Sequence, residues 1–417
     1  MKLRITSTDT ELSAFEVLGF ALYFLVEINV EIFVRRPIYI GAALFLVTVL
    51  LLSNRTRYRV TSYVTWTILW VVMVASSITY SIQPSTTITA LLTVAARGLV
   101  FVTILSRINS YETLTKVLKI LIFVEFFNLL YVFSKVNILT IGNLRIGDKS
   151  IITDSDATWN SNSISAVAVA CTIYALCLLH NNRFKHRSLM VIVVILYSVV
   201  VLLCGSRMGL LLLVGIPLAW LAISSNHRNF FFRLMGGIIA AIIVYYIVMY
   251  VPAVYQVLGR RIETLIRNIM GQNVTDGSII DRQNLISHGL DWFKERPFFG
   301  FGMYTFKERL LWQYGYSRYA HNSYIEVLVG TGIVGIIVYY WHYIYLIVKS
   351  WRIKYNHWQI VLSAMLVIMV AEFATVSFKN FTFQFALCVI SMVQKIGLSA
   401  ERDEQYQQGE FIEKKLG

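Results

Sequence analysis

Residues 189–223 read LMVIVVILYSVVVLLCGSRMGLLLLVGIPLAWLAI, which is two apolar runs joined by the short link CGSRMG. Each run approaches the ~20 apolar residues that a helix needs to cross the hydrocarbon core of a bilayer. Arg207, in the link, carries the one charge of the stretch. The pattern predicts two consecutive membrane-spanning helices, with the Arg207 guanidinium at the membrane surface between them.

The same composition extends over the whole chain. Its 417 residues are 57% apolar and 14% charged, whereas soluble domains are about 45–50% apolar and about 25% charged. We therefore predict an all-α polytopic membrane protein with about twelve spans. The expected spans cover residues 13–33, 38–53, 61–82, 87–106, 117–137, 163–180, 188–204, 207–224, 234–252, 323–347, 357–376 and 381–396.

Short basic loops set the expected orientation. The segments 54–59, 181–187, 226–233 and 349–357 are rich in Lys and Arg and fall on one side of the predicted membrane. Cytoplasmic loops carry such an excess, so this side and both termini are expected inside a bacterial cytoplasmic membrane. The net charge of +14 is interpreted in the same way, and no nucleic acid is expected as a partner.

Four segments follow from this topology. Residues 1–252 hold nine spans, and 253–322 form a large extracytoplasmic loop with short helices. Residues 323–398 hold three further spans, and 399–417 form a polar cytoplasmic tail. A second outside loop is expected near 138–162. The large loop is rich in arginine, which suggests an anionic ligand, and the alternatives are a solvated face or attraction to anionic headgroups.

His321 is the first candidate for chemistry outside the membrane. Ser323 and Glu326 have the spacing of a capping box, which predicts that the next span begins at Ser323. His321 then lies beside a helix N-terminus, where backbone N–H groups favour an anion. The alternative is a capping cluster in which the imidazole has no catalytic role.

Two arginines are further candidates. Arg207 follows Ser206, a candidate N-cap, and a guanidinium can bind phosphate with two hydrogen bonds. Arg282 lies near the start of a predicted amphipathic loop helix that ends before Pro297. The alternatives are an interfacial arginine that reaches water and a position on a solvated helix face.

Three charges fall inside predicted spans: Arg97, Glu125 and Glu372. Burying a charge at the bilayer centre is costly, so we expect them to pair within the bundle, Arg97 with Glu125 on the next span. Structural and functional roles are both open. The sequence has no P-loop and no HExxH motif, and no metal or other cofactor is expected.

Three motifs around the large loop together resemble a known family. GSRMGL at 205–210, RPFFGFG at 296–302 and HNSYIEVLVGTGIVG at 321–335 are similar, in this order, to those of O-antigen polymerases and ligases of the Wzy and WaaL types. The resemblance covers roughly residues 200–340. It implies a membrane-embedded glycosyltransferase of the GT-C type, acting outside the cytoplasmic membrane on sugars linked to undecaprenyl diphosphate.

The resemblance also implies roles for individual residues. Arg207 and Arg282 correspond to the arginines that hold the diphosphate, and His321 to the histidine that serves as general base. Further candidates for substrate binding are Arg97, Asn322, Tyr324 and Glu372. Because two guanidinium groups can neutralise a leaving diphosphate, we expect an inverting, metal-independent transfer.

Several functions remain open. We favour a polymerase that joins lipid-linked repeat units into O-antigen, capsule or exopolysaccharide, with membrane lipids, a flippase and a chain-length regulator as expected partners. A ligase would transfer the chain to lipid A core, and a related enzyme would transfer it to protein. A transporter for lipid-linked oligosaccharides is the alternative from another class, and it would place its sugar site at the membrane midplane.

Overall fold

The protein is helical throughout the residues that the computed structural model describes, which are 11–28, 36–135, 145–146, 160–180, 187–223, 230–272, 277–352 and 358–416. Each expected span corresponds to one apolar helix. These helices are α1 (Ala14–Ile28), α2 (Arg36–Leu52), α3 (Ser62–Ser76), α4 (Pro84–Arg107), α5 (Tyr111–Lys135), α6 (Ser161–His180), α7 (Arg187–Leu203), α8 (Arg207–Ile223), α9 (Phe230–Tyr250), α14 (Ser323–Arg352), α15 (Trp358–Ala371) and α16 (Phe381–Leu416).

Six of the described helices are long and apolar enough to cross a membrane, and a bent pair, Leu234–Tyr250 with Pro252–Ile269, raises the number to seven. Further apolar helices, such as α7 and α8, are shorter than this test requires. The expected number of about twelve is larger because several of the apolar stretches form helices of 17 residues or fewer. The chain is a multi-pass membrane protein.

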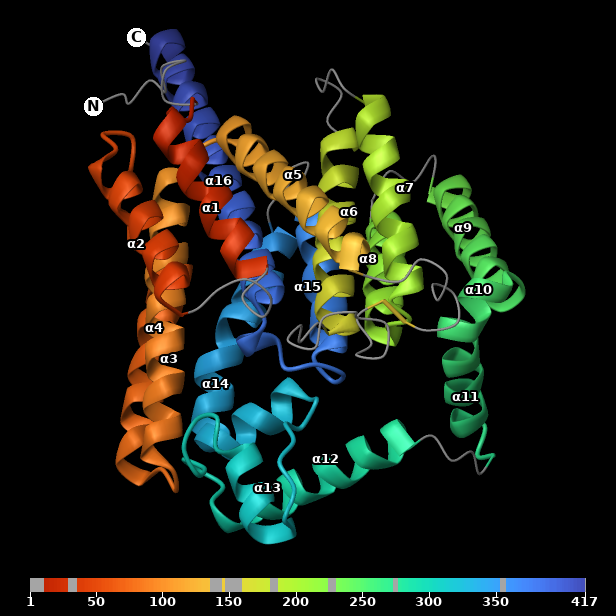
Figure 1. Ribbon diagram of the computed structural model, residues 1–417. Coiled ribbons are helices and arrows are strands. Elements are labelled where there is room, and N and C mark those ends of the chain that lie inside the picture. The colour runs from red at the N-terminus through yellow and green to blue at the C-terminus, as the bar shows by residue number, and fades with distance from the viewer. Residues whose placement is uncertain are drawn as a thin grey trace.

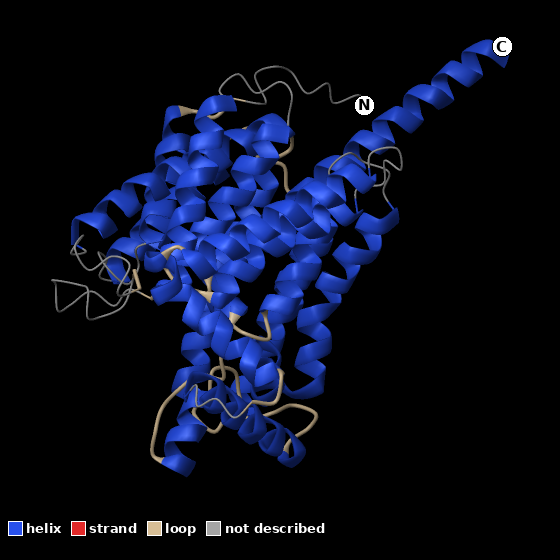
Figure 2. Cartoon of the chain, turned by 90° about the vertical axis from the view of Figure 1, so that its right-hand side faces the viewer, coloured by secondary structure: helices blue, strands red, loops and turns tan. Residues whose placement is uncertain are grey.

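The two ends of the bundle differ. α1 begins and α16 ends at one end of the molecule, here called the terminal end (Figure 1). α12 and α13 lie at the opposite end, here called the loop end. Residues 399–416, expected as a separate polar tail, continue α16 as helix to Leu416, and Figure 2 shows this extension projecting from the bundle.

The long segment between α9 and α14 is also helical. Its elements are α10 (Pro252–Val254), the π-helical turn η5 (Tyr255–Gly259), α11 (Arg260–Ile269), α12 (Gly277–Glu295) and α13 (Phe306–Tyr314). α12 ends before Pro297, as the sequence predicted. Short 3₁₀ turns, η2 (Ser77–Tyr80) and η6 (Ser377–Lys379), follow α3 and precede α16. Most of the other expected loop, 138–162, lies outside the described residues.

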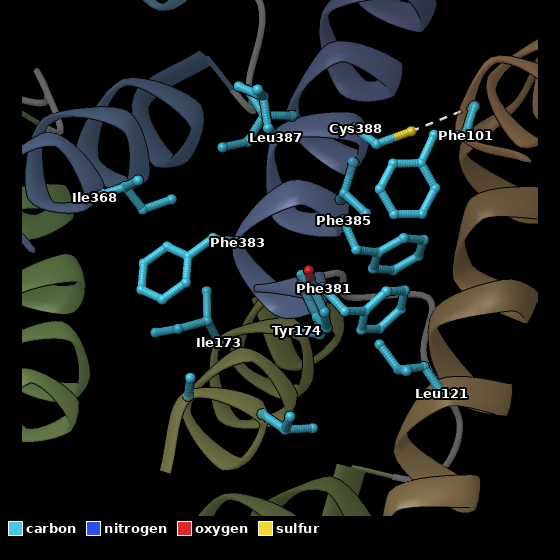
Figure 3. Close-up of a cluster of buried hydrophobic side chains, with 14 of the residues drawn as sticks. Phe101, Leu121, Ile173, Tyr174, Ile368, Phe381, Phe383, Phe385, Leu387 and Cys388 are labelled. Carbon is cyan, nitrogen blue, oxygen red and sulfur yellow. Dashed lines mark hydrogen bonds between the residues drawn. The ribbon is translucent and has the colours of Figure 1, made fainter. Parts of the chain in front are cut away.

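The main core runs along α16. The rings of Phe381 and Phe385 stack on one side of this helix, with their centroids 5.5 Å apart. Both face Phe101 of α4, as Figure 3 shows. Phe383 lies with Ile173 of α6 on another side. Aromatic rings bury large apolar areas. α16 therefore packs firmly between α4 and α6, and this packing fixes the residues at the start of α16.

A second, smaller core lies at the loop end. It joins α12, α13 and the first turns of α14 through the buried side chains of Leu285, Trp292, Phe301, Phe306, Leu310, Ala320, Ile325 and Val329. The approach of α12 to α14 is close, since a Cβ on Gly289 would lie 2.3 Å from Ile325. This small core fixes the chain immediately before His321.

Candidate active site at the loop end

The chain enters α14 through a strained residue. His321 has a left-handed backbone conformation with φ of 53°, which costs energy in a residue other than glycine and is held only by its surroundings. Asn322 then caps α14, because its Oδ1 accepts a hydrogen bond of 3.2 Å from the N–H of Ile325. α14 begins at Ser323, as the sequence predicted.

The capping box expected between Ser323 and Glu326 is wrong, because both side chains form hydrogen bonds with other groups. Ser323 Oγ does not cap the helix but donates to the Thr375 carbonyl at 2.8 Å, since Asn322 already occupies the capping position. Glu326 Oε1 accepts from the Ala320 N–H at 2.9 Å. The carboxylate of Glu326 therefore fixes the backbone just before His321.

The surroundings of His321 keep its imidazole neutral. The pKa of His321 is lowered to about 4, first by burial and then by the positive charges of Arg282 and Arg318, against a smaller opposite effect of Asp281. The ring of Tyr319 packs 4.0 Å from the imidazole, centroid to centroid. A neutral imidazole at pH 7 can accept a proton, which is what a general base requires.

Arg207 and Arg282 meet the same helix. Ser206 caps α8 as expected, accepting from the Gly209 N–H at 3.1 Å, and Arg207 is the first residue of that helix. Arg207 Nη2 donates to Ser278 Oγ at 2.8 Å. Ser278 lies one turn before Arg282 on α12, so these two residues lie on the same face of the helix. Arg207 therefore contacts the face of α12 that carries Arg282.

Two further contacts hold this region together. Arg318, three residues before His321, forms an ion pair with Asp281 of α12. Arg261 Nη1 donates to the Gly205 carbonyl at 3.0 Å, next to the start of α8. Segments far apart in the sequence are thus tied together around Arg207, Arg282 and His321.

The glycine-rich motifs lock the loop against α14. α14 is interrupted at Gly332, with φ of 65° and ψ of −164°, which frees backbone groups on both sides of the break. The Val329 and Gly330 carbonyls accept from Phe301 N and Gly302 N at 2.8 and 2.9 Å, and Ile333 N donates to the Pro297 carbonyl at 2.9 Å.

Glycine is required at this junction for steric reasons. A Cβ on Gly300 would lie 2.4 Å from the Val329 carbonyl oxygen, and one on Gly332 would lie 2.3 Å from the backbone of Phe298. Both residues also have positive φ, which glycine adopts without cost. The PFFGFG and VGTGIVG motifs therefore form one backbone junction between the loop and α14, and this junction supports the candidate site.

A polar cavity of about 350 Å³ lies beside His321, within the size range of small-molecule sites. His321 and Tyr319 line it together with residues of α1, α4, α5, α6, α8 and the turn before α16. The polar side chains that line it are Glu27, Arg97, Glu125, Asn128, Asn160, Asn162, Ser163, Thr375, Lys379, Asn380 and Thr382. Met208, next to Arg207 in the sequence, also lines it, whereas Arg207 and Arg282 are not part of the lining.

The cations of this cavity have partners other than those expected. The predicted Arg97–Glu125 pair is wrong: Arg97 Nε contacts Glu27 Oε1 of α1 at 3.2 Å, because α1 rather than α5 presents its carboxylate to Arg97. Arg97 Nη1 also donates to the Lys379 carbonyl at 3.1 Å. Lys379 Nζ lies 3.3 Å from Glu326 Oε2.

The three remaining candidates, Asn322, Tyr324 and Glu372, make contacts within the protein. Asn322 is buried as the helix cap. Tyr324 donates its O–H to the Met369 carbonyl at 2.8 Å and stacks on Tyr340. Glu372 is fully buried and accepts from the hydroxyls of Tyr340, Tyr343 and Ser377 at 2.5, 3.0 and 2.6 Å. These three residues are not part of the cavity lining.

Sequence reasoning did not single out Glu27, Asn128 and Lys379, which line the cavity. Asn128 follows Glu125 by three residues, so both lie on one face of α5, and this spacing was a usable signal. Lys379 lies in the short link between two apolar runs, as Arg207 does. For Glu27 no local signal exists, since its partner Arg97 is 70 residues away.

A comparison with known families matches the same region. Residues 192–340 match the Wzy_C family model, described as O-antigen ligase, and the match includes Arg207, Arg282 and His321. No curated protein matches the chain. Members of this family are glycosyltransferases. The chain thus contains a Wzy_C O-antigen ligase family domain, the domain that WaaL ligases and Wzy polymerases share.

Proposed function

We propose that the protein polymerises oligosaccharide repeat units linked to undecaprenyl diphosphate, using His321 as general base and Arg207 and Arg282 to hold the diphosphate. The observation that carries this proposal is the grouping of these residues around α12, beside a polar cavity in a membrane protein with a Wzy_C domain. The expected product is O-antigen, capsule or exopolysaccharide.

The reaction requires the transfer of one proton and the departure of the diphosphate leaving group. A hydroxyl oxygen of the acceptor sugar attacks the anomeric carbon of the donor and loses its proton to the neutral His321 imidazole. The bond from the anomeric carbon to the diphosphate oxygen breaks, and the electron pair leaves with the diphosphate. Attack opposite the leaving group inverts the anomeric configuration.

The arginines act on the leaving group. Negative charge grows on the diphosphate as its bond to the sugar breaks, and fixed guanidinium groups stabilise that charge without reorganising. Arg207 also lies at the N-terminus of α8, where the helix dipole favours an anion. The link through Ser278 keeps Arg207 next to the helix that carries Arg282.

A second cavity supports a place for the lipid tail. It measures about 170 Å³, lies between α5, α6, α8, α15 and α16, and is lined almost entirely by apolar side chains. Thr382 lines this cavity and the polar one. We infer that the polyprenyl chain enters the apolar cavity while the diphosphate and sugar occupy the polar one.

The proposal includes a topology. We infer that the twelve apolar helices each cross a bacterial cytoplasmic membrane, with the terminal end inside and the loop end outside. The start of α1 and the end of α16 lie at one end of the bundle, which supports an even number of crossings. The basic link 53–61 also lies at the terminal end, which supports that end as cytoplasmic.

Purified protein tests the function directly. Incubated with lipid-linked repeat units alone, it is expected to produce a ladder of longer lipid-linked chains. The matched family is described as O-antigen ligase, and this favours ligation to lipid A core as the second candidate. Product that forms only when lipid A core is added would replace the polymerase proposal by the ligase, and no transfer in either case would refute both.

A further inference from the structure

Glu125 and Asn128 form an unusual polar pair on α5. They are 0% and 5% exposed, lie three residues apart on one helix face, and both line the polar cavity. Asn128 Nδ2 donates to Glu125 Oε2 at 2.9 Å. Within the described part of the chain, Glu125 Oε1 and Asn128 Oδ1 have no hydrogen-bond partner.

Such a pair is costly unless a ligand completes it. A buried polar atom without a partner loses its hydration and gains nothing in return. Ionisable residues inside membrane segments usually pair with other protein groups or face a water-filled cavity. Arg97, which the sequence predicted as the partner of Glu125, is instead held by Glu27. The two oxygens without a partner therefore belong to side chains that line the space where substrate is proposed to enter.

The charges around the cavity decide what kind of group fits these oxygens. The cationic side chains of Arg97 and Lys379 and the imidazole of His321 line other parts of it. A carboxyl group disfavours phosphate but forms good hydrogen bonds with hydroxyls. A hydroxyl can also accept from a carboxyl O–H, so it suits Glu125 in either protonation state. Sugars offer such hydroxyls in adjacent pairs.

We propose that Glu125 and Asn128 form a subsite for sugar hydroxyls, which accepts hydrogen bonds from two hydroxyls of the sugar residue that enters the polar cavity. The inference rests on the proposed function and deepens it. The subsite contributes to the affinity for the oligosaccharide and to the choice among sugars, because an analogue lacking a hydroxyl leaves these buried oxygens unpaired.

Two lipids that differ only in the sugar test this subsite. The probes are undecaprenyl diphosphate and the same lipid carrying one repeat unit, and their dissociation constants are measured with the protein in nanodiscs. In the double variant Glu125→Leu with Asn128→Leu, the constant for the sugar-bearing lipid is expected to rise about tenfold or more. The constant for undecaprenyl diphosphate is expected to stay within about twofold.

Thermal stability and a matched variant separate binding from folding. Apolar replacements of an unsatisfied pair are expected to leave the melting temperature unchanged or raised. Glu112→Gln, on the same helix but with a 59% exposed side chain paired to Lys116, is expected to change neither dissociation constant. Glu125→Gln is a milder second variant, expected to weaken sugar binding less than the double variant does.

Three results would overturn the inference. Unchanged affinity of the double variant for the sugar-bearing lipid would remove the subsite alone, and so would an equal loss of affinity for both lipids, which would indicate a structural role. If the unmodified protein binds the sugar-bearing lipid no more tightly than undecaprenyl diphosphate and fails to elongate it, the proposed function falls together with the subsite.

Discussion

The polar cavity and the apolar cavity share Thr382 in their linings and differ in chemistry. The polar one, about 350 Å³, is lined by amide, hydroxyl and charged side chains among apolar ones, and the apolar one, about 170 Å³, is lined mostly by aliphatic and aromatic groups. Both use the first turns of α16, where Phe381 faces one and Phe383 the other. In a membrane protein, buried polar groups are expensive. The polar side chains that line the first cavity therefore make it the better place for the polar part of a substrate.

Two ion pairs join the same helices, α1 and α4, and differ in their surroundings. Arg107 and Glu16 are 1% exposed each and lie away from both cavities. Arg97 and Glu27 are 13% and 2% exposed and line the polar cavity. The chemistry of the pairs is identical, so only their surroundings distinguish a pair that joins two helices from one that can also contact a ligand.

The largest effect is expected from His321→Asn. Asparagine tolerates the left-handed backbone of this position, so the variant is expected to fold and to bind undecaprenyl diphosphate, but it has no imidazole to accept a proton. Its rate of chain elongation should fall about a hundredfold or more, measured by product ladders from purified protein. Elongation at the normal rate would show that the reaction does not use His321 as its base.

The next largest effect is expected at the arginines. Arg207→Ala and Arg282→Ala should each lower kcat/KM by about a hundredfold, as the loss of one transition-state contact does. Arg260→Ala changes an exposed arginine of α11 and serves as the control. Equal behaviour of all three variants would show that the two arginines matter no more than general positive charge at the loop end.

A smaller effect is expected in the apolar cavity. Ala364 of α15 lines it, and Ala364→Phe would fill part of the space. The KM for a donor with a full polyprenyl chain should rise about tenfold, and that for a short-chain donor should change less. The control is Leu366→Phe, on the same helix with 41% exposure. An unchanged KM for both donors would show that the tail lies elsewhere.

The smallest effect is expected from pH near neutrality. A general base works when deprotonated, and the pKa of His321 is lowered to about 4 by burial and by neighbouring arginines. Between pH 6 and 8, kcat/KM should therefore change by less than about twofold, with a decline only in more acid solution. A decline that begins near pH 6.5 would contradict the buried setting of this imidazole.

Apolar periodicity and length were enough to predict the helical fold, the break before Pro297 and the start of α14 at Ser323. Those features depend on local sequence, as does the cap at Ser206. The partners of Arg97 and Glu326 could not be predicted, because they depend on which helices become neighbours, and α1 meets α4 over a separation of 70 residues. The junction of Gly300 with Gly332 likewise needs two distant segments in contact.

An experimental structure with undecaprenyl diphosphate bound, solved by electron microscopy in nanodiscs, tests the central claim most directly. The account predicts phosphate density within hydrogen-bond distance of the guanidinium groups of Arg207 and Arg282, beside His321, and a lipid tail that passes Thr382 into the apolar cavity. Phosphates bound at the terminal end, or at the loop end without contact to either arginine, would contradict it.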